Sequence, residues 1–185
     1  MVRNSKGGTR GYTLVEMILV IALLGIAAAL VIPTFGSVGV LRVQAAVRTV
    51  VADITVAQSD AVALQKGRGI VFENDNNDPR YTIAEVNGGR LDTALDRLTV
   101  RHIGGKEYGD TTITAINFPS NTLVFDELGG PVDGPGSSTP AAAGYIDIRG
   151  SEQTFRINVD AYTGRVQVTA VPNAAPPAGG AGSGG

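Results

Sequence analysis

The feature that most constrains this chain is a long apolar run near its N-terminus. No charged residue occurs between Met17 and Ile32, and extension back to Tyr12 adds only Thr13 and Glu16 as polar residues. At 1.5 Å of rise per residue, a helix over this stretch is roughly 30 Å long, the thickness of a bilayer's hydrocarbon core. The sequence therefore predicts a membrane-spanning helix over residues 12–33.

The residues before this run form a short basic leader. Arg3, Lys6 and Arg10 lie there without any acid. Because basic residues beside a membrane helix stay in the cytoplasm, we expect the C-terminal part to lie on the outer side. The whole chain has a net charge of -2, and without residues 1–11 it is more acidic, so no broad basic surface for nucleic acid is expected.

Three other readings of the run compete. A secretory signal peptide would be cut after the apolar run, but the run ends in Val31, Ile32 and Pro33 without a small-residue exit. A simple anchor gives no reason to hold Glu16 at the edge of the apolar run, where a charge is costly. A buried core helix is rarely this apolar on every side.

Lys6-Gly-Gly-Thr-Arg-Gly-Tyr-Thr-Leu-Val-Glu16 resembles the processing site of type IV prepilins and type II secretion pseudopilins. The resemblance implies cleavage by a prepilin peptidase between Gly11 and Tyr12, removal of residues 1–11, and N-methylation of Tyr12. Tyr12 stands where the family usually has Phe. The resemblance extends to Pro33, at the place of a helix-kinking proline.

Glu16 has a physical role that can be stated without the family. A carboxylate in hydrocarbon is costly unless a cation meets it. Cleavage before Tyr12 would create an α-amine on the same apolar helix, and Glu16 of one subunit could neutralise that amine in its neighbour. We therefore predict that Glu16 sets the register between subunits.

The rest of the chain predicts an α+β fold in which the long helix packs on an antiparallel β-sheet head. Apolar residues from Val43 to Leu64 recur at helical spacing, which predicts an amphipathic upper half over residues 34–66 that ends before Gly67 and Gly69. Period-two patterns predict a head over residues 67–171, and a Gly/Ala/Pro tail over 172–185 is expected to be disordered. A flexible loop is predicted over 129–144. The predicted strands are 70–73, 81–86, 98–101, 112–118, 123–126, 145–149, 154–159 and 166–171.

The sequence carries no pattern of an active site, so no enzyme and no cofactor is predicted. It has no cysteine, and its one histidine, His102, reads as a residue at the end of a strand. The one oxygen-rich cluster is 74–78. It reads as a hairpin turn, with a calcium site at Asp75 and Asp78 as the alternative.

The head resembles the GspH/FimT minor pseudopilins in its helix end at 53–67, followed by a strand, and in its closing segment 157–166. The resemblance implies a minor subunit of a type II secretion pseudopilus or a type IV pilus. It implies, as partners, the prepilin peptidase, other pilins and an assembly platform in the bacterial inner membrane, with the head on the periplasmic side. The alternative is a DNA-binding pilin for DNA uptake that uses Arg149, Arg156 and Arg165, although Gln167 replaces a second arginine of that family's pattern.

Overall fold

The computed structural model describes residues 11–31, 35–75, 78–95 and 100–172. The chain divides into two units, residues 1–38 and residues 39–185, which are treated separately below. Residues 1–10 of the predicted leader, Pro33 and residues 173–185 of the predicted tail lie outside the described residues.

Two helices occupy the N-terminal third of the chain. Helix α1 covers Leu14–Val31 and α2 covers Phe35–Leu64. At the end of α2 the backbone of Gln65 turns left-handed (φ 52°), and the Lys66 amide donates to the Ala61 carbonyl at 3.2 Å. This six-to-one bond is a Schellman cap. The helix therefore ends at Leu64. Gln65 terminates it, two residues before Gly67, where the sequence predicted the end.

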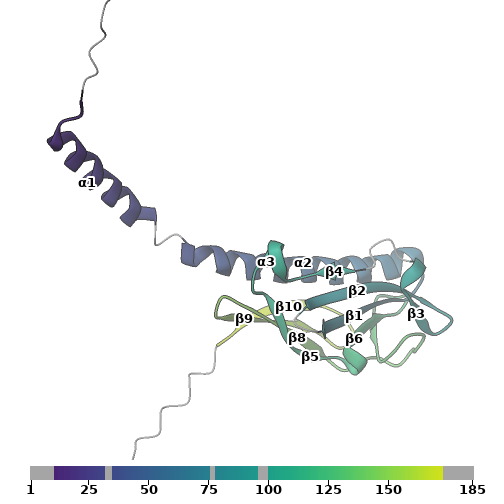
Figure 1. The fold of residues 1–185 in the computed structure, drawn as a ribbon. Helices are drawn as coiled ribbons and strands as arrows, with labels where there is room; N and C mark the ends of the chain where they lie inside the picture. The colour runs from purple at the N-terminus through teal and green to yellow at the C-terminus, as the bar shows by residue number, and fades with distance from the viewer. Residues whose placement is uncertain (1–10, 32–34, 76–77, 96–99, 173–185) are drawn as a thin grey trace, which may run out of the picture. The chain divides into compact units, whose positions relative to one another are not determined.

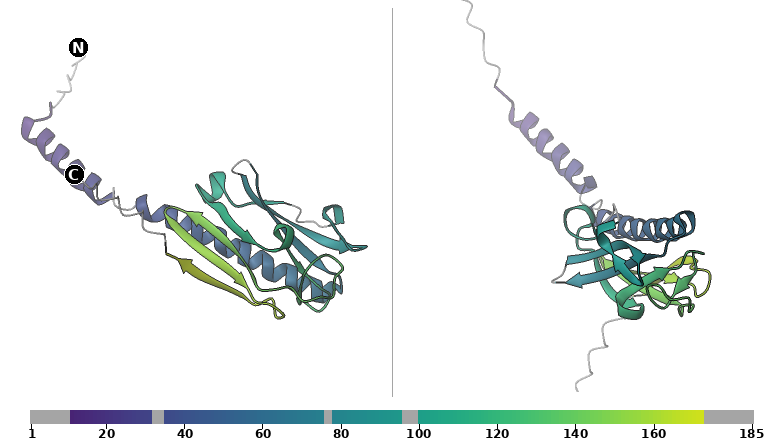
Figure 2. Two further views of the ribbon diagram at one scale, coloured as in Figure 1. Left: turned by 90° about the horizontal axis from the view of Figure 1, so that it is seen from below. Right: turned by 90° about the vertical axis from the view of Figure 1, so that its right-hand side faces the viewer.

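The head contains two antiparallel sheets, which the views in Figures 1 and 2 show beside α2. The first has the order β3-β2-β1-β6-β7, with β4 also paired to β2. Its strands are β1 (Arg68–Asp75), β2 (Asp78–Asn87), β3 (Arg90–Asp92), β4 (Arg101–His102), β6 (Thr122–Phe125) and β7 (Pro131–Val132).

The second sheet has the order β10-β9-β8-β5, so β10 and β5 are its edges. Its strands are β5 (Thr112–Asn117), β8 (Gly144–Gly150), β9 (Gln153–Val159) and β10 (Val166–Val171). Three short helices complete the described fold: η2 (Thr93–Leu95), α3 (Gly105–Tyr108) and η3 (Pro119–Asn121).

The apolar stripe of α2 forms one side of the core. Its members are buried from Val43 to Ala61, whereas the last predicted member, Leu64, is exposed. Their partners come from both sheets, and they include Ile70 and Phe72 of the first sheet and the isoleucines of β8 and β9 in the second. A helix that is apolar on one face thus packs on two sheets that are apolar on their inner faces.

Gln58 of α2 joins the ends of the two sheets. Its Nε2 donates to the Gly129 carbonyl at 2.8 Å and to the Thr163 carbonyl at 2.9 Å. Gly129 follows β6 in the first sheet, and Thr163 lies in the β9–β10 turn of the second. One side chain therefore fixes two loops to the same helix.

The α+β prediction is confirmed, with additions that the sequence did not reveal. The predicted strands correspond to β1, β2, β5, β6, β8, β9 and β10, while the predicted strand 98–101 is described only at its end, where β4 begins. The structure adds β3 and β7. Strand β7 lies in the segment 129–144, where the sequence predicted only a flexible loop, and Val132 and Ala141 are buried there.

Candidate assembly site and polar clusters of the head

The predicted cleavage site leads directly into a capped helix. Gly11, Tyr12 and Thr13 precede α1 without regular structure, and the Tyr12 side chain is 75% exposed. The Glu16 amide donates to Thr13 Oγ1 at 3.2 Å. Thr13 is therefore the N-cap residue, and it fixes the first turn of the helix just after the predicted cut.

The Thr13 cap was readable from the sequence and was missed there. Thr13-Leu-Val-Glu16 has the Ser/Thr-x-x-Glu spacing of a capping box. Glu16 lies in the first turn of α1, where the partial positive charge of the helix N-terminus favours an acid. Glu16 thus favours the start of the helix, and its exposed side chain is accessible to a partner molecule.

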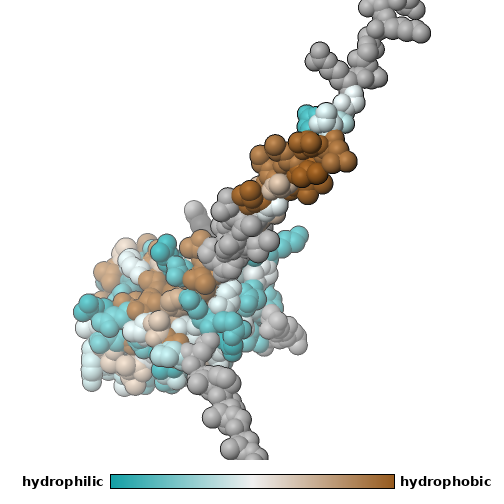
Figure 3. Space-filling view, turned by 90° about the vertical axis from the view of Figure 1, so that its left-hand side faces the viewer, coloured by the Kyte–Doolittle hydropathy of each residue, from teal (hydrophilic) through white to brown (hydrophobic). Residues whose placement is uncertain are grey.

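Helix α1 is apolar on all its faces. Its large side chains from Leu14 to Ile26 are exposed, and the space-filling view shows the helix almost uniformly apolar on the visible side (Figure 3). Within the described residues, no helix has both the length and the hydropathy needed to cross a bilayer. A helix without a polar face is stable only where lipid or other apolar surfaces surround it.

The three arginines predicted as possible DNA contacts do not form a group of free cations. Arg156 makes a bidentate pair with Asp147, its Nε and one terminal nitrogen each 2.8 Å from a carboxylate oxygen, and stacks 3.7 Å above the Tyr145 ring. The Asp147 hydrogen bond raises the pKa of Arg156. Arg149 lies 3.7 Å from Glu152. Arg165 lies in the β9–β10 turn beside a shallow pocket.

The oxygen-rich turn joins β1 to β2 and serves to connect elements of the head. Asn74 Nδ2 donates to the Ile113 carbonyl of β5 at 2.8 Å and so links the two sheets. Asp78 pairs with Nδ1 of His102 at 2.9 Å and with Arg80 at 3.4 Å. The hydrogen bond from His102 lowers the pKa of Asp78. Asp78, one of the two carboxylates predicted as calcium ligands, is thus already engaged by His102 and Arg80.

The described residues hold no group of three His, Asp or Glu side chains arranged to bind a metal. The side chain of Asp75, the second predicted calcium ligand, lies outside the described part of the chain. His102, which the sequence placed at a strand end, lies in β4.

One buried polar cluster was not predicted. Asp53 of α2 is buried, and its Oδ2 accepts a hydrogen bond from the Tyr81 hydroxyl at 2.5 Å. The Nε of Arg101 lies 2.6 Å from the same oxygen. Burial raises the pKa of the Tyr81 hydroxyl, and the hydrogen bond to Asp53 raises it further. The cluster joins α2, β2 and β4, which gives it a structural role.

Comparison with known proteins places a family motif at the N-terminus. Residues 6–32 match the model of the prokaryotic N-terminal methylation motif. A solved structure with a similar chain is the type IV minor pilin FimU of Pseudomonas aeruginosa, at 17% sequence identity and a TM-score of 0.47, covering 69% of this chain and 96% of that one. No curated protein matches the chain.

The methylation motif covers the predicted cleavage site, the capped start of α1 and the apolar helix itself. It is followed by a second helix that packs on an antiparallel β head. The chain thus joins a prokaryotic N-terminal methylation motif at residues 6–32 to an α+β head.

Proposed function

We propose that the chain is a minor subunit of a type II secretion pseudopilus or type IV pilus, of the GspH/FimT kind. The observation that carries the proposal is the methylation motif at residues 6–32, which contains a helix with no polar face. Such a helix needs an apolar environment on all sides. A bilayer provides it before assembly, and the helices of neighbouring subunits provide it in a fibre.

In this proposal a prepilin peptidase cuts between Gly11 and Tyr12, and Tyr12 becomes an N-methylated terminus. The apolar helix then holds the subunit in the inner membrane with the head outside, and Pro33 bends the helix. In the sequence, the apolar run continues past Val31, the last described residue of α1, to Ile32. The assembly platform would extract the subunit from the membrane into the fibre.

Glu16 fixes the register of the subunit. The carboxylate is exposed at the first turn of α1, one turn from the new N-terminus. In the low dielectric of packed apolar helices, its attraction to a neighbour's α-amine is stronger than in water, and a misplaced register leaves both charges without a partner. The pair therefore selects one stagger more than it adds net stability.

The test replaces Glu16 by Ala in the full chain within its native cells. Cleavage and membrane insertion should continue, because Thr13 still caps the helix and the apolar run is intact. Incorporation into sheared fibres should fall strongly. Glu152→Ala, which removes an exposed acid of the head, is the matched control and should be incorporated normally. Normal incorporation of the Glu16 variant would contradict the proposed role.

A further inference from the structure

Strand β10 is a free edge of the second sheet, and it carries no charge. Its sequence, Val-Gln-Val-Thr-Ala-Val, pairs only with β9 among the described strands. Unpaired backbone groups along a strand edge are a template for another strand. Proteins usually protect such edges with charged residues, proline, bulges or very short strands. Strand β10 has six residues and none of these devices.

The other described edges are protected. Strand β3 has three residues, two of them charged, while β4 and β7 have two residues each, and β7 begins with Pro131. Strand β5 has a bulge between Ile113 and Ala115, and the side chain of Asn74 binds the carbonyl at this point. The contrast sets β10 apart as an edge adapted to pairing.

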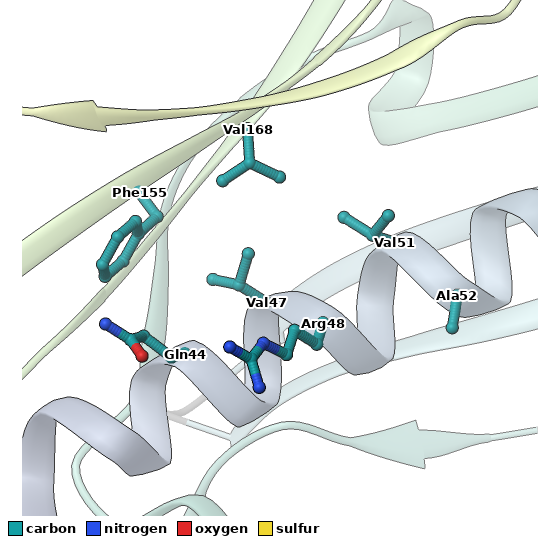
Figure 4. Close-up of a pocket in the computed structure, with 7 residues that line it drawn as sticks. All are labelled: Gln44, Val47, Arg48, Val51, Ala52, Phe155 and Val168. Carbon is teal, nitrogen blue, oxygen red and sulfur yellow. The ribbon is translucent and has the colours of Figure 1, made fainter.

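The inner face of β10 borders an open apolar groove. Val166, Val168 and Ala170 pair with Val159, Ile157 and Phe155, so they lie on the face of the sheet that looks toward α2. The helix does not cover this edge, and Val168 remains 45% exposed. The groove has a volume of about 420 Å³. Figure 4 shows Phe155 and Val168 facing Val47 and Val51 of α2 across it, with Gln44 and Arg48 alongside on the helix.

From the free edge and the groove together, we infer that β10 is a docking strand for a second copy of this chain, through antiparallel pairing of β10 with β10. In a two-fold symmetric pair, opposite residues must lie on the same face of the sheet, because the axis is perpendicular to it. The pairing that centres on Val168 meets this condition. It places Val168 opposite its own copy, Val166 opposite Ala170, and Gln167 opposite Thr169.

This register matches like with like. On the inner face, valine and alanine meet valine and alanine, and the second copy's Val168 and Val166 extend the apolar surface over the groove beside Val51. On the outer face, Gln167 meets Thr169. No charged side chain of β10 opposes itself, which is the usual obstacle to symmetric strand pairing. A second copy therefore pairs with the backbone groups on the free edge of β10 and covers the apolar groove. This pairing does not require that the chain is assembled into a fibre.

The test uses cysteine cross-linking, because the chain has no cysteine of its own. Opposite Cβ atoms in an antiparallel pair lie about 4.5–5.5 Å apart, close to the separation that a disulfide spans. The full chain with Val168→Cys, held in dilute detergent micelles and oxidised with copper phenanthroline, should give a covalent dimer as its main product. A mixture of Gln167→Cys chains with Thr169→Cys chains should form the mixed dimer.

Two register positions are tested because adjacent pairs alternate between wide and narrow spacing, so at least one has the narrow spacing that favours a bond. Leu128→Cys is the matched control, since Leu128 is 84% exposed in the turn before β7, away from β10. It reports cross-linking by chance encounter or through α1. Adding Ala170→Glu to Val168→Cys should abolish the dimer, because it places a carboxylate on the apolar face of the pair, while the thermal melt stays unchanged.

Dimer yields from both β10 positions no greater than that of Leu128→Cys would overturn the inference. A dimer that persists in the Ala170→Glu chain would also overturn it. A dimer of Gln167→Cys chains alone, or of Thr169→Cys chains alone, that exceeds both the Val168→Cys dimer and the mixed dimer would refute the register centred on Val168.

Discussion

The buried hydroxyl of Tyr81 should make the stability of the head depend on alkaline pH. Tyr81 is 1% exposed, and its hydroxyl donates a hydrogen bond to Asp53 Oδ2 at 2.5 Å. Replacement by Phe removes this donor from Asp53 Oδ2, which still lies 2.6 Å from Arg101 Nε. Loss of one partner in a buried hydrogen bond costs about 1–3 kcal/mol. We expect Tyr81→Phe to lower the free energy of unfolding by this amount at pH 8.

The sign of the pH effect follows from the direction of the shift. Burial and Asp53 raise the pKa of Tyr81 in the folded state, whereas the unfolded chain has a tyrosine pKa near 10. The contribution of Tyr81 to the free energy of unfolding is therefore fully present below pH 10. It is lost as the pH rises above 10, because the unfolded chain then releases a proton that the folded chain keeps. At pH 11 this one proton lowers the free energy of unfolding by about 1.4 kcal/mol.

The assay is urea unfolding at pH 8 and pH 11, followed by circular dichroism, on a fragment that starts at Gly39 and so contains the whole described core. The Phe variant lacks the titrating group. The stability gap between the two proteins should therefore narrow by about 1.4 kcal/mol between pH 8 and pH 11. Tyr162→Phe, at a 75% exposed tyrosine, is the control, and it should leave the free energy of unfolding unchanged at both pH 8 and pH 11. A gap that stays constant with pH would refute the reasoning.

Two further predictions concern the head. A Cβ on Gly144 would lie 2.3 Å from a Phe118 ring carbon and 2.5 Å from the Asn117 carbonyl oxygen, so Gly144→Ala should lower the free energy of unfolding by about 1–3 kcal/mol. Gly134→Ala, where nothing lies within 4 Å, is its control in the same urea titration, and equal losses would contradict the packing argument. The full chain should not shift duplex DNA in a low-salt gel, because Asp147 already neutralises Arg156. A salt-dependent shift that Arg165→Ala removes would instead support the DNA-binding alternative.

Much of the fold could be predicted because its patterns are local. The spacing from Val43 to Ala61 defined the buried face of α2, and alternation predicted the long strands, including those that form β9 and β10. The short strands β3, β4 and β7 have too few residues for a period to appear. The division into two sheets depends on contacts between distant residues, such as Asn74 with Ile113.

The polar sites show the same limit. Asp53 occurs among polar neighbours of the stripe, and only the approach of Tyr81 and Arg101 from other elements explains why it is buried. Arg156 reads as a surface cation until the register of β8 and β9 places Asp147 directly opposite it. Thr13 is different, since its cap is local and its signature was present in the sequence. The calcium, DNA and Pro33 hypotheses remain predictions.

The most direct test of the account is the N-terminal mass of the protein isolated from its native membranes or fibres. If a prepilin peptidase prepares the apolar helix for assembly, the chain begins at Tyr12 and carries one methyl group on its α-amine. Tandem mass spectrometry of the first peptide resolves both features. A mature chain that begins at Met1, or after the apolar run, would contradict the account.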